Sequence, residues 1–295
     1  MNAVLVTGAT GLVGRHATAA LTARGFRVHG LARKGAEHEV DLFDGEAVRA
    51  CLETVRPSHL LHLAWITEPG RYWTAPENLE WQSASLDLVR AFHAAGGRRA
   101  VIAGSCAEYD WETLPDAPID EGFACRPASL YGSAKHALRV AIAAFARPRE
   151  LSYAWGRIFY VYGGPEPEQR LVPSVARALL AGEEAKCGSG TGRRDFIEAR
   201  DVGAAFAALI DSEIEGPCNV ASGESHTIAE VAQTIAELVG RPELLRLGGL
   251  ADRPGEPATL VADIARLREE AGFAPAVPLR EGLAEAVRFW RTRAR

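Results

Sequence analysis

Three glycines near the start of the chain constrain its fold more than any other feature. They stand at positions 8, 11 and 14, after a short apolar run over 3–6 and before an amphipathic stretch over 13–24. This order predicts a buried strand, a tight turn and a helix, which together form the first unit of a parallel sheet. Glycine lets the backbone approach a diphosphate closely, and the N-terminus of the next helix then faces the negative charge. The turn therefore predicts a dinucleotide site.

Apolar runs alternate with helical patterns through the first half of the chain. Strands are predicted over 3–6, 27–31, 59–63, 99–103 and 152–157, and helices over 13–24, 45–55, 78–95 and 129–146. Strand–helix alternation is typical of a parallel, doubly wound sheet. We therefore expect an α/β protein with a Rossmann-type sheet.

The alternation breaks after about residue 163, where 163–167 forms a loop. Helices are then predicted over 173–181, 201–210, 228–239 and 279–292, with a short strand over 218–220. We expect a smaller, interleaved C-terminal α/β domain that faces the substrate. The predicted division gives 1–165 plus about 196–216 to the dinucleotide-binding domain, and about 166–195 plus 217–295 to the substrate domain.

Composition argues against several kinds of partner and site. The 33 basic and 38 acidic residues give a net charge of −5, which leaves no electrostatic footprint for nucleic acid. The five cysteines are odd in number and form no C-x-x-C pair, so we expect no disulfide framework, no metal site and a reduced, cytoplasmic setting. The chain enters a strand at once and has no apolar run long enough to span a bilayer, so we expect neither a signal peptide nor a membrane partner.

Tyr131 and Lys135 lie four residues apart on a predicted helix and therefore share one face. A free tyrosine titrates near ~10, but a lysine cation one turn away is expected to lower that pKa. Ser105 follows the predicted strand 99–103, at the sheet edge where ligands of such folds bind. There it can hydrogen-bond the same substrate oxygen that Tyr131 protonates. The three residues predict carbonyl–alcohol chemistry; the alternative is a chance tyrosine and lysine on one helix face.

With these residues in place, the chain resembles the extended short-chain dehydrogenase/reductase superfamily. Within that superfamily it resembles the NAD-dependent epimerase/dehydratase family, whose members act on nucleotide sugars. The resemblance runs through nearly the whole chain. Its motifs are T-G-x-x-G-x-x-G at 7–14, Asp41-Leu42, His62-Leu63-Ala64, Ser105 with Tyr131 and Lys135, 160–163, 193–197 with Asp201-Val202, 219–224, 253–256 and 261–263.

The resemblance implies roles for individual residues. The implied cofactor contacts are Gly8, Thr10, Gly11, Leu12, Val13, Gly14, Asp41, Leu42, Leu63, Ala64, Tyr131 and Lys135. The implied contacts to a nucleoside-diphosphate sugar are Ser105, Cys106, Tyr160, Arg194 and Arg253. The two arginines would hold the diphosphate, because guanidinium forks match phosphate oxygens. The resemblance also implies a homodimer built on two helices per subunit, the Tyr131/Lys135 helix and a second one, for which the helix over 78–95 is the candidate.

Two departures from the family pattern bear on the reaction. Ser105-Cys106-Ala107 stands where the family's dehydratases carry Thr-Asp-Glu, so the acid and base that eliminate water are missing. The second predicted strand runs into Arg33 and Lys34, without the carboxylate that bonds the ribose hydroxyls in NAD binders. This favours NADP(H) slightly over NAD(H), with Arg33 on the 2′-phosphate. The alternatives for Arg33 are stacking on adenine or simple solvation.

We therefore expect an NAD(P)-dependent nucleotide-sugar oxidoreductase that reduces the C4 ketone of a nucleoside-diphosphate 4-keto-6-deoxyhexose. The alternative is a 4-epimerase, similar to UDP-glucose 4-epimerase, that retains tightly bound NAD. A non-catalytic nucleotide-sensing protein is disfavoured by the intact serine, tyrosine and lysine. An aromatic patch, Trp65, Tyr72, Trp73 and Trp81, either packs under a loop or lines the sugar or base pocket.

Overall fold

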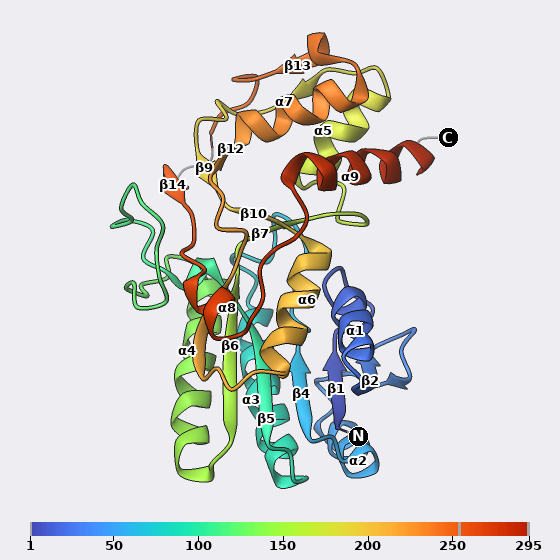
Figure 1. Cartoon of the computed structure of the whole chain (residues 1–295), viewed down its shortest axis with the longest axis vertical. Coiled ribbons are helices and arrows are strands. Elements are labelled where there is room, and N and C mark those ends of the chain that lie inside the picture. The colour runs from blue at the N-terminus through green and yellow to red at the C-terminus, as the bar shows by residue number, and fades with distance from the viewer. Residues whose placement is uncertain (1, 253–254, 294–295) are drawn as a thin grey trace.

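A seven-stranded sheet forms the centre of the fold. Its strands are β1 (Ala3–Thr7), β2 (Arg27–Ala32), β3 (His38–Glu39), β4 (His59–His62), β5 (Arg99–Ser105), β6 (Ser152–Ile158) and β11 (Gly216–Val220). The computed structural model, which describes residues 2–252 and 255–293, orders them β11-β6-β5-β4-β1-β2-β3 with every neighbouring pair parallel (Figure 1). The order reverses between β4 and β1, which makes the carboxyl ends of these two strands the topological switch point.

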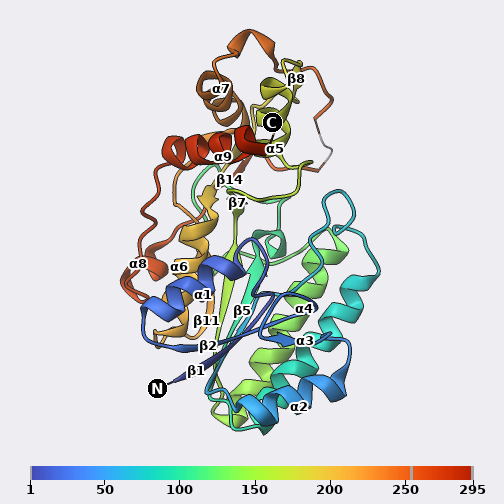
Figure 2. The same cartoon turned by 90° about the vertical axis from the view of Figure 1, so that its right-hand side faces the viewer.

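Helices cover both faces of the sheet, as the continuous apolar strands predict. The helices α1 (Gly14–Ala23) and α6 (Ala199–Ile210) lie on one face, and α2 (Gly45–Val55), α3 (Glu77–Ala94) and α4 (Leu130–Ala146) lie on the other (Figure 2). Alternate residues of β1 supply the two cores: Val4 and Val6 pack on the α1/α6 side, and Leu5 packs on the α2/α3/α4 side. The predicted Rossmann-type α/β fold is confirmed.

A smaller helical cluster lies beyond the carboxyl ends of the strands (Figure 1). It contains α5 (Leu171–Leu180), α7 (Ile228–Val239) and α9 (Leu279–Arg293), which share a separate apolar core. Short strands pair in and below this cluster: β8 (Ala185–Lys186) with β13 (Leu245–Arg246), and β9 (Arg193–Arg194) with β12 (His226–Thr227) and β14 (Thr259–Leu260). Two further strands, β7 (Tyr160–Tyr162) and β10 (Phe196–Glu198), pair with each other between the cluster and the sheet.

The C-terminal half returns to the sheet in two places. Strand β11 pairs with β6, and the short helix α8 (Ala265–Glu269) packs beside β11 through Leu267. The division at 216/217 suggested by sequence therefore cuts through a strand of the central sheet. The run Cys218–Val220 reads as a strand from its apolar residues, but its partner lies about sixty residues earlier in the chain, and local sequence does not reveal that pairing.

The helix proposed from sequence as a second dimer helix is α3. Its apolar residues Leu88, Val89 and Phe92 are buried against the sheet, whereas Leu79 is exposed. On the neighbouring helix α4, Val140 is also exposed. Within residues 2–252 and 255–293, no helix combines the length and the apolar character needed to cross a membrane.

Candidate active site

The glycine turn fills the space between β1 and β4 at the switch point. Gly8 follows β1 with φ +67°, a left-handed backbone that favours glycine, and a Cβ added there would lie 3.0 Å from the main-chain nitrogen of Ala64. A Cβ on Gly14 would overlap the carbonyl of Gly8. Helix α1 then begins at Gly14 behind Val13, whose side chain makes no capping hydrogen bond. The turn therefore combines close-packed backbone with an uncapped helix N-terminus at the carboxyl end of β1, which suits a diphosphate.

A chain of three side chains fixes the two strand ends that carry this turn. The Ser85 hydroxyl donates to a carbonyl one helical turn earlier, so it accepts from His62 Nε2 at 2.8 Å. His62 Nδ1 then accepts from the Thr7 hydroxyl at 2.7 Å, and that hydroxyl in turn accepts from the N–H groups of Leu63 and Ala64. Burial lowers the pKa of His62 to about 3, so the ring is neutral and holds one tautomer.

The remaining residues expected at a cofactor lie along the same edge of the sheet. Thr10 is exposed in the glycine turn, and Arg33 is exposed just after β2. The carboxylate of Asp41 accepts from the Phe43 N–H at 3.1 Å, whereas Leu42 is buried on the α2 side of the sheet. The structure thus brings the glycine turn, Leu63 and Ala64 together, with Arg33 and Asp41 farther along the edge.

Ser105 is held in place by a buried carboxylate that sequence reasoning left without a role. It ends β5 and begins a single helical turn over Cys106–Glu108. Glu108 Oε1 accepts from the Ser105 N–H at 2.9 Å and from Trp155 Nε1 at 2.7 Å, and Glu108 also pairs with Arg157 at 3.4 Å. Glu108 and Arg157 are almost fully buried. A carboxylate three residues after a serine at a helix start is the signal that predicts this capping box.

Lys135 and Tyr131 extend from the first turns of α4, which Ser129 caps through the Gly132 N–H. Lys135 is buried; its Nζ donates to the Ala103 carbonyl at 2.8 Å and lies 3.7 Å from the centre of the Trp65 ring. Burial lowers the pKa of Lys135 to about 7, while the charge of Glu108 acts in the opposite direction. The ammonium is therefore close to its titration point at neutral pH.

The pKa of Tyr131 departs from expectation. Burial raises it, and the nearby Ser105 side chain offsets only part of that rise. The lowered pKa that the spacing of Tyr131 and Lys135 predicts is wrong for this arrangement. Desolvation of the phenolate dominates, and the Lys135 ammonium is held on the Ala103 carbonyl and the Trp65 ring instead.

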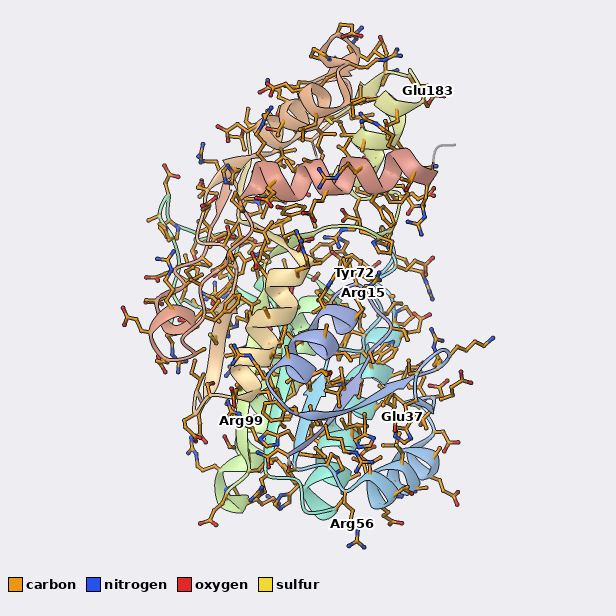
Figure 3. All side chains as sticks on the ribbon, turned by 45° about the vertical axis from the view of Figure 1, so that its right-hand side comes forward. Arg15, Glu37, Arg56, Tyr72, Arg99 and Glu183 are labelled. Carbon is orange, nitrogen blue, oxygen red and sulfur yellow. The ribbon has the colours of Figure 1, made fainter. Side chains whose placement is uncertain are left out.

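Part of the aromatic patch surrounds the ring of Tyr131. Tyr72 and Trp73 meet it edge-to-face at centroid distances of 5.0 and 5.8 Å, and Trp111 meets Trp73 at 5.9 Å. The Tyr131 N–H also donates to the carbonyl of Trp73 at 3.1 Å. Tyr72 lies where the sheet meets the helical cluster (Figure 3). These half-buried rings line the approach to Tyr131, and Trp111 was missed because it lies outside the 65–81 segment.

The other two members of the patch lie elsewhere. Trp65 packs under Lys135 and donates through Nε1 to Asn78 Oδ1 at 2.8 Å. The ring of Trp81 meets Phe43 edge-to-face at a centroid distance of 4.8 Å and lies tilted against Trp65 at 6.1 Å. Trp65 therefore has the role of a packing residue, because its ring is buried. Tyr72 and Trp73 instead contact the ring of Tyr131.

Arg194 is the strongest candidate for an anion contact on the side of the helical cluster. It is 1% exposed, pairs with Glu256 at 3.1 Å and lies over the Tyr160 ring at 5.4 Å. Its Nε is buried and has no hydrogen-bond partner among the described residues. Burial raises the pKa of the neighbouring Cys106 thiol to about 12, and the charge of Arg194 opposes that rise. The structure brings Cys106, Tyr160 and Arg194 together; Arg253 lies outside the described residues.

Comparison with known proteins agrees with this geometry. Residues 4–222 match the sequence model of the NAD dependent epimerase/dehydratase family. A UDP-glucose 4-epimerase of Rhizobium meliloti (strain 1021) is 27% identical in an alignment 326 positions long, which covers 99% of this chain and 98% of the relative. A dTDP-4-dehydro-6-deoxy-D-allose reductase of Streptomyces bikiniensis is 29% identical over 321 residues, with 98% and 96% covered. Among solved structures, MoeE5 in complex with UDP-glucose and NAD is 32% identical, with a TM-score of 0.87 and 99% of each chain covered.

Proposed function

The chain belongs to the NAD-dependent epimerase/dehydratase family, and from this premise we propose that it is an oxidoreductase acting at C4 of a nucleoside-diphosphate sugar. The observation that carries the proposal is the meeting of three parts at one sheet edge. These are the glycine turn after β1, Ser105 after β5, and Tyr131 with Lys135 at the start of α4. An edge of this kind is where open α/β sheets bind their ligands.

The residues at the switch point fit a nicotinamide dinucleotide. Gly8 and Gly14 let the turn pack directly against the main chain of Ala64 and of the turn itself, and the uncapped N-terminus of α1 follows the turn. We propose that Gly8, Thr10, Gly11, Leu12, Val13 and Gly14 hold the diphosphate, and that Leu63, Ala64, Asp41 and Leu42 border the rest of the cofactor. When bound, the nicotinamide supplies or takes up the hydride of the reaction.

The chain's own residues would move the proton. In the reductive direction the C4 carbonyl becomes an alkoxide, and Tyr131 donates its phenolic proton to that oxygen, which leaves a phenolate. Ser105 donates a hydrogen bond to the same oxygen and polarises the carbonyl. The raised pKa of Tyr131 keeps the phenol protonated before reaction. Lys135, one turn away, is proposed to bind the ribose hydroxyls of the cofactor.

Arg194 and Tyr160 would hold the substrate beyond the sugar. A guanidinium that is nearly fully buried, with one N–H lacking a partner, is a ready donor to a phosphate oxygen. We propose that Arg194 and Arg253 bind the diphosphate, with Tyr160 and Cys106 beside the sugar. Helices α3 and α4, which expose Leu79 and Val140, are proposed as the contact of a homodimer.

The finer assignment is reduction of the C4 ketone of a nucleoside-diphosphate 4-keto-6-deoxyhexose, with NADP(H) preferred over NAD(H). Its support is the exposed Arg33 after β2, where a carboxylate for the ribose hydroxyls would stand in an NAD binder. The similarity to a dTDP-4-dehydro-6-deoxy-D-allose reductase points the same way. A 4-epimerase with retained NAD is the second candidate, favoured by the similarity to UDP-glucose 4-epimerases.

Identification of the bound dinucleotide separates these two functions. Freshly purified full-length protein is denatured, and any released dinucleotide is identified by chromatography. We expect either an almost empty site or released NADP(H). We also expect added NADPH to be oxidised when a nucleoside-diphosphate 4-keto-6-deoxyhexose is supplied. Stoichiometric NAD⁺ with interconversion of UDP-glucose and UDP-galactose would overturn the reductase in favour of the epimerase. A protein that binds dinucleotide but converts neither kind of sugar nucleotide would overturn both.

A further inference from the structure

Two histidines and a glutamate converge at the outer edge of the sheet, away from the candidate active site. His29 lies in β2, His38 begins β3, and Glu37 directly precedes it on the segment that Figure 3 labels at Glu37. His29 Nδ1 is 3.0 Å from Glu37 Oε1 and 3.5 Å from His38 Nε2, and the last two atoms are 3.6 Å apart. Among the residues placed by the structure, this is the only group of three such ligand atoms within 4.8 Å of one another.

The pairing of β2 with β3 explains why the three side chains meet. His29 and Leu31 are two residues apart on a strand and therefore point to the same face. Leu31 is the register partner of His38, so His38 stands beside that face. The meeting depends on strand register, and the adjacent letters of the sequence do not show it. The spacing of the cysteines, on which the expectation of no metal site rested, carries no information about this group.

The spacing of the three atoms matches the edges of a metal coordination polyhedron. Zinc binds imidazole nitrogen and carboxylate oxygen at about 2.0–2.2 Å, so neighbouring ligands of a tetrahedral ion lie about 3.3–3.5 Å apart. We propose that His29, Glu37 and His38 bind a divalent transition-metal ion such as Zn²⁺, with solvent at the remaining position. Imidazole ligands select such ions over Mg²⁺, which prefers oxygen. The open position faces outward, because the Glu37 side chain is 52% exposed and that of His38 is 23% exposed.

An ordinary histidine–carboxylate ion pair explains the contact of His29 with Glu37 but not the approach of His38 to both of them. His226 and Glu224 form such a pair at 3.1 Å, with one nitrogen on one oxygen. At the β2–β3 edge a second imidazole nitrogen approaches both the first nitrogen and the same oxygen. His29 is also only 6% exposed, and a buried polar ring needs a partner to offset its desolvation. A bound ion satisfies all three atoms at once and ties β3 to β2.

Zinc titration of metal-stripped, full-length protein tests the proposal by calorimetry and thermal unfolding. We expect one Zn²⁺ per chain, a higher melting temperature with zinc, and no competition from equimolar Mg²⁺. His38→Gln removes the more exposed histidine and is expected to weaken zinc affinity by at least about 100-fold, since losing a residue that only hydrogen-bonds to a metal ligand already costs about tenfold to 100-fold. The matched control, His226→Gln, removes a histidine from a pair that lacks the second imidazole and is expected to bind as the wild type does.

Three outcomes would overturn the metal site. They are a wild-type chain that takes up no zinc at one-to-one stoichiometry, a His38→Gln variant that binds zinc as tightly as the wild type, and a His226→Gln variant that loses as much affinity. If His38→Gln fails to fold, Glu37→Gln, whose side chain is half exposed, replaces it with the same expected loss. The measurement does not use enzyme activity, so its failure is independent of the proposed function.

Discussion

The two sides of the candidate active site are built in different ways. The cofactor side consists of the glycine turn and the end of β4, and it is held mainly by backbone packing and by the Thr7–His62–Ser85 chain. The substrate side is built from side chains of separate segments: Tyr72 and Trp73, Cys106, Tyr131, Tyr160 and Arg194. The shape of one side is set by small residues, and the other carries the groups proposed to react with and bind the substrate.

Because of this difference, substitutions on the two sides are expected to have different consequences. Added atoms on the cofactor side collide with backbone, so changes there act on folding and on dinucleotide binding together. On the substrate side an isosteric change leaves the packing intact and removes a single polar group. Single substitutions on each side can therefore test that separation.

Tyr131→Phe is expected to reduce turnover by about 10² to 10⁴-fold, the usual range for loss of a general acid. The ring contacts with Tyr72 and Trp73 persist in the variant, because only the hydroxyl is removed. We therefore expect an unchanged melting temperature and unchanged dinucleotide affinity, measured by thermal unfolding and by fluorescence titration with NADPH and NADH.

Tyr72→Phe is the matched control for this change. It removes a hydroxyl from the ring that packs edge-to-face on Tyr131, and it leaves the proton donor in place. Its turnover is expected to stay close to that of the wild type. Full turnover in Tyr131→Phe would contradict the assigned chemistry, and a large fall in its melting temperature would contradict the separation of the two sides.

The sequence predicted the cofactor side more completely than the substrate side, for a physical reason. The glycine turn is contiguous, and its glycines are required by contacts within the βα unit and with the end of β4. The strands and helices of the central sheet follow from apolar periodicity, which is also local. The predicted pKa of Tyr131 was wrong because it rested on the spacing of Tyr131 and Lys135 along a helix, whereas the burial that raises the pKa depends on residues packed around the ring from elsewhere in the chain, Tyr72 and Trp73 among them.

Two features of the site depend on contacts between distant residues. The Glu108–Arg157 pair that anchors Ser105 joins residues 49 apart. The approach of Tyr160 to the Arg194 guanidinium depends on the Tyr160 N–H, which donates to the carbonyl of Asp195 directly after β9 at 3.0 Å. The resemblance named Arg194 and Tyr160, but only the structure shows their burial and mutual contact.

Gly8→Ala is expected to damage the cofactor side in two ways. The left-handed backbone costs a non-glycine residue about 1–2 kcal/mol, and the new Cβ would press on the main chain of Ala64. We expect a lower melting temperature and about a tenfold or greater loss of dinucleotide affinity, because the turn must shift away from β4.

Gly25→Ala provides the matched control. Gly25 has φ +82°, but a Cβ there meets nothing within 4 Å, so the variant carries the backbone strain without the collision. Its melting temperature is expected to fall while its dinucleotide affinity stays within about twofold of wild type. Equal affinity losses in the two variants would show that general destabilisation, rather than the close approach at Gly8, controls binding.

His62→Gln is expected to have the smallest effect at neutral pH, and its main consequence is a changed pH dependence of the free energy of unfolding. The pKa of His62 is about 3 in the folded chain, against 6.5 for the free side chain, so between these values the unfolded state binds one more proton. Wild-type stability therefore falls as pH drops below about 6.5, with a contribution from this group of about 1.4 kcal/mol per pH unit. Glutamine does not titrate, so the variant should lose that part of the slope.

The measurement is the free energy of unfolding by urea at several pH values between 4 and 8. At pH 8 the variant is expected to be less stable by about 1 kcal/mol, the usual value of a hydrogen bond, because an amide replaces the imidazole between Thr7 and Ser85 imperfectly. The two curves should approach each other as pH falls and cross at about pH 6, since only the wild type carries the cost of a neutral buried histidine, about 1.4 kcal/mol per pH unit below 6.5. Parallel curves would mean that His62 takes up a proton in the folded state, which its place between the Thr7 and Ser85 hydroxyls opposes. In that event the Thr7–His62–Ser85 hydrogen bonds would yield to protonation of the ring. The cofactor side would then be less rigid than those bonds indicate, and its contrast with the substrate side would not hold.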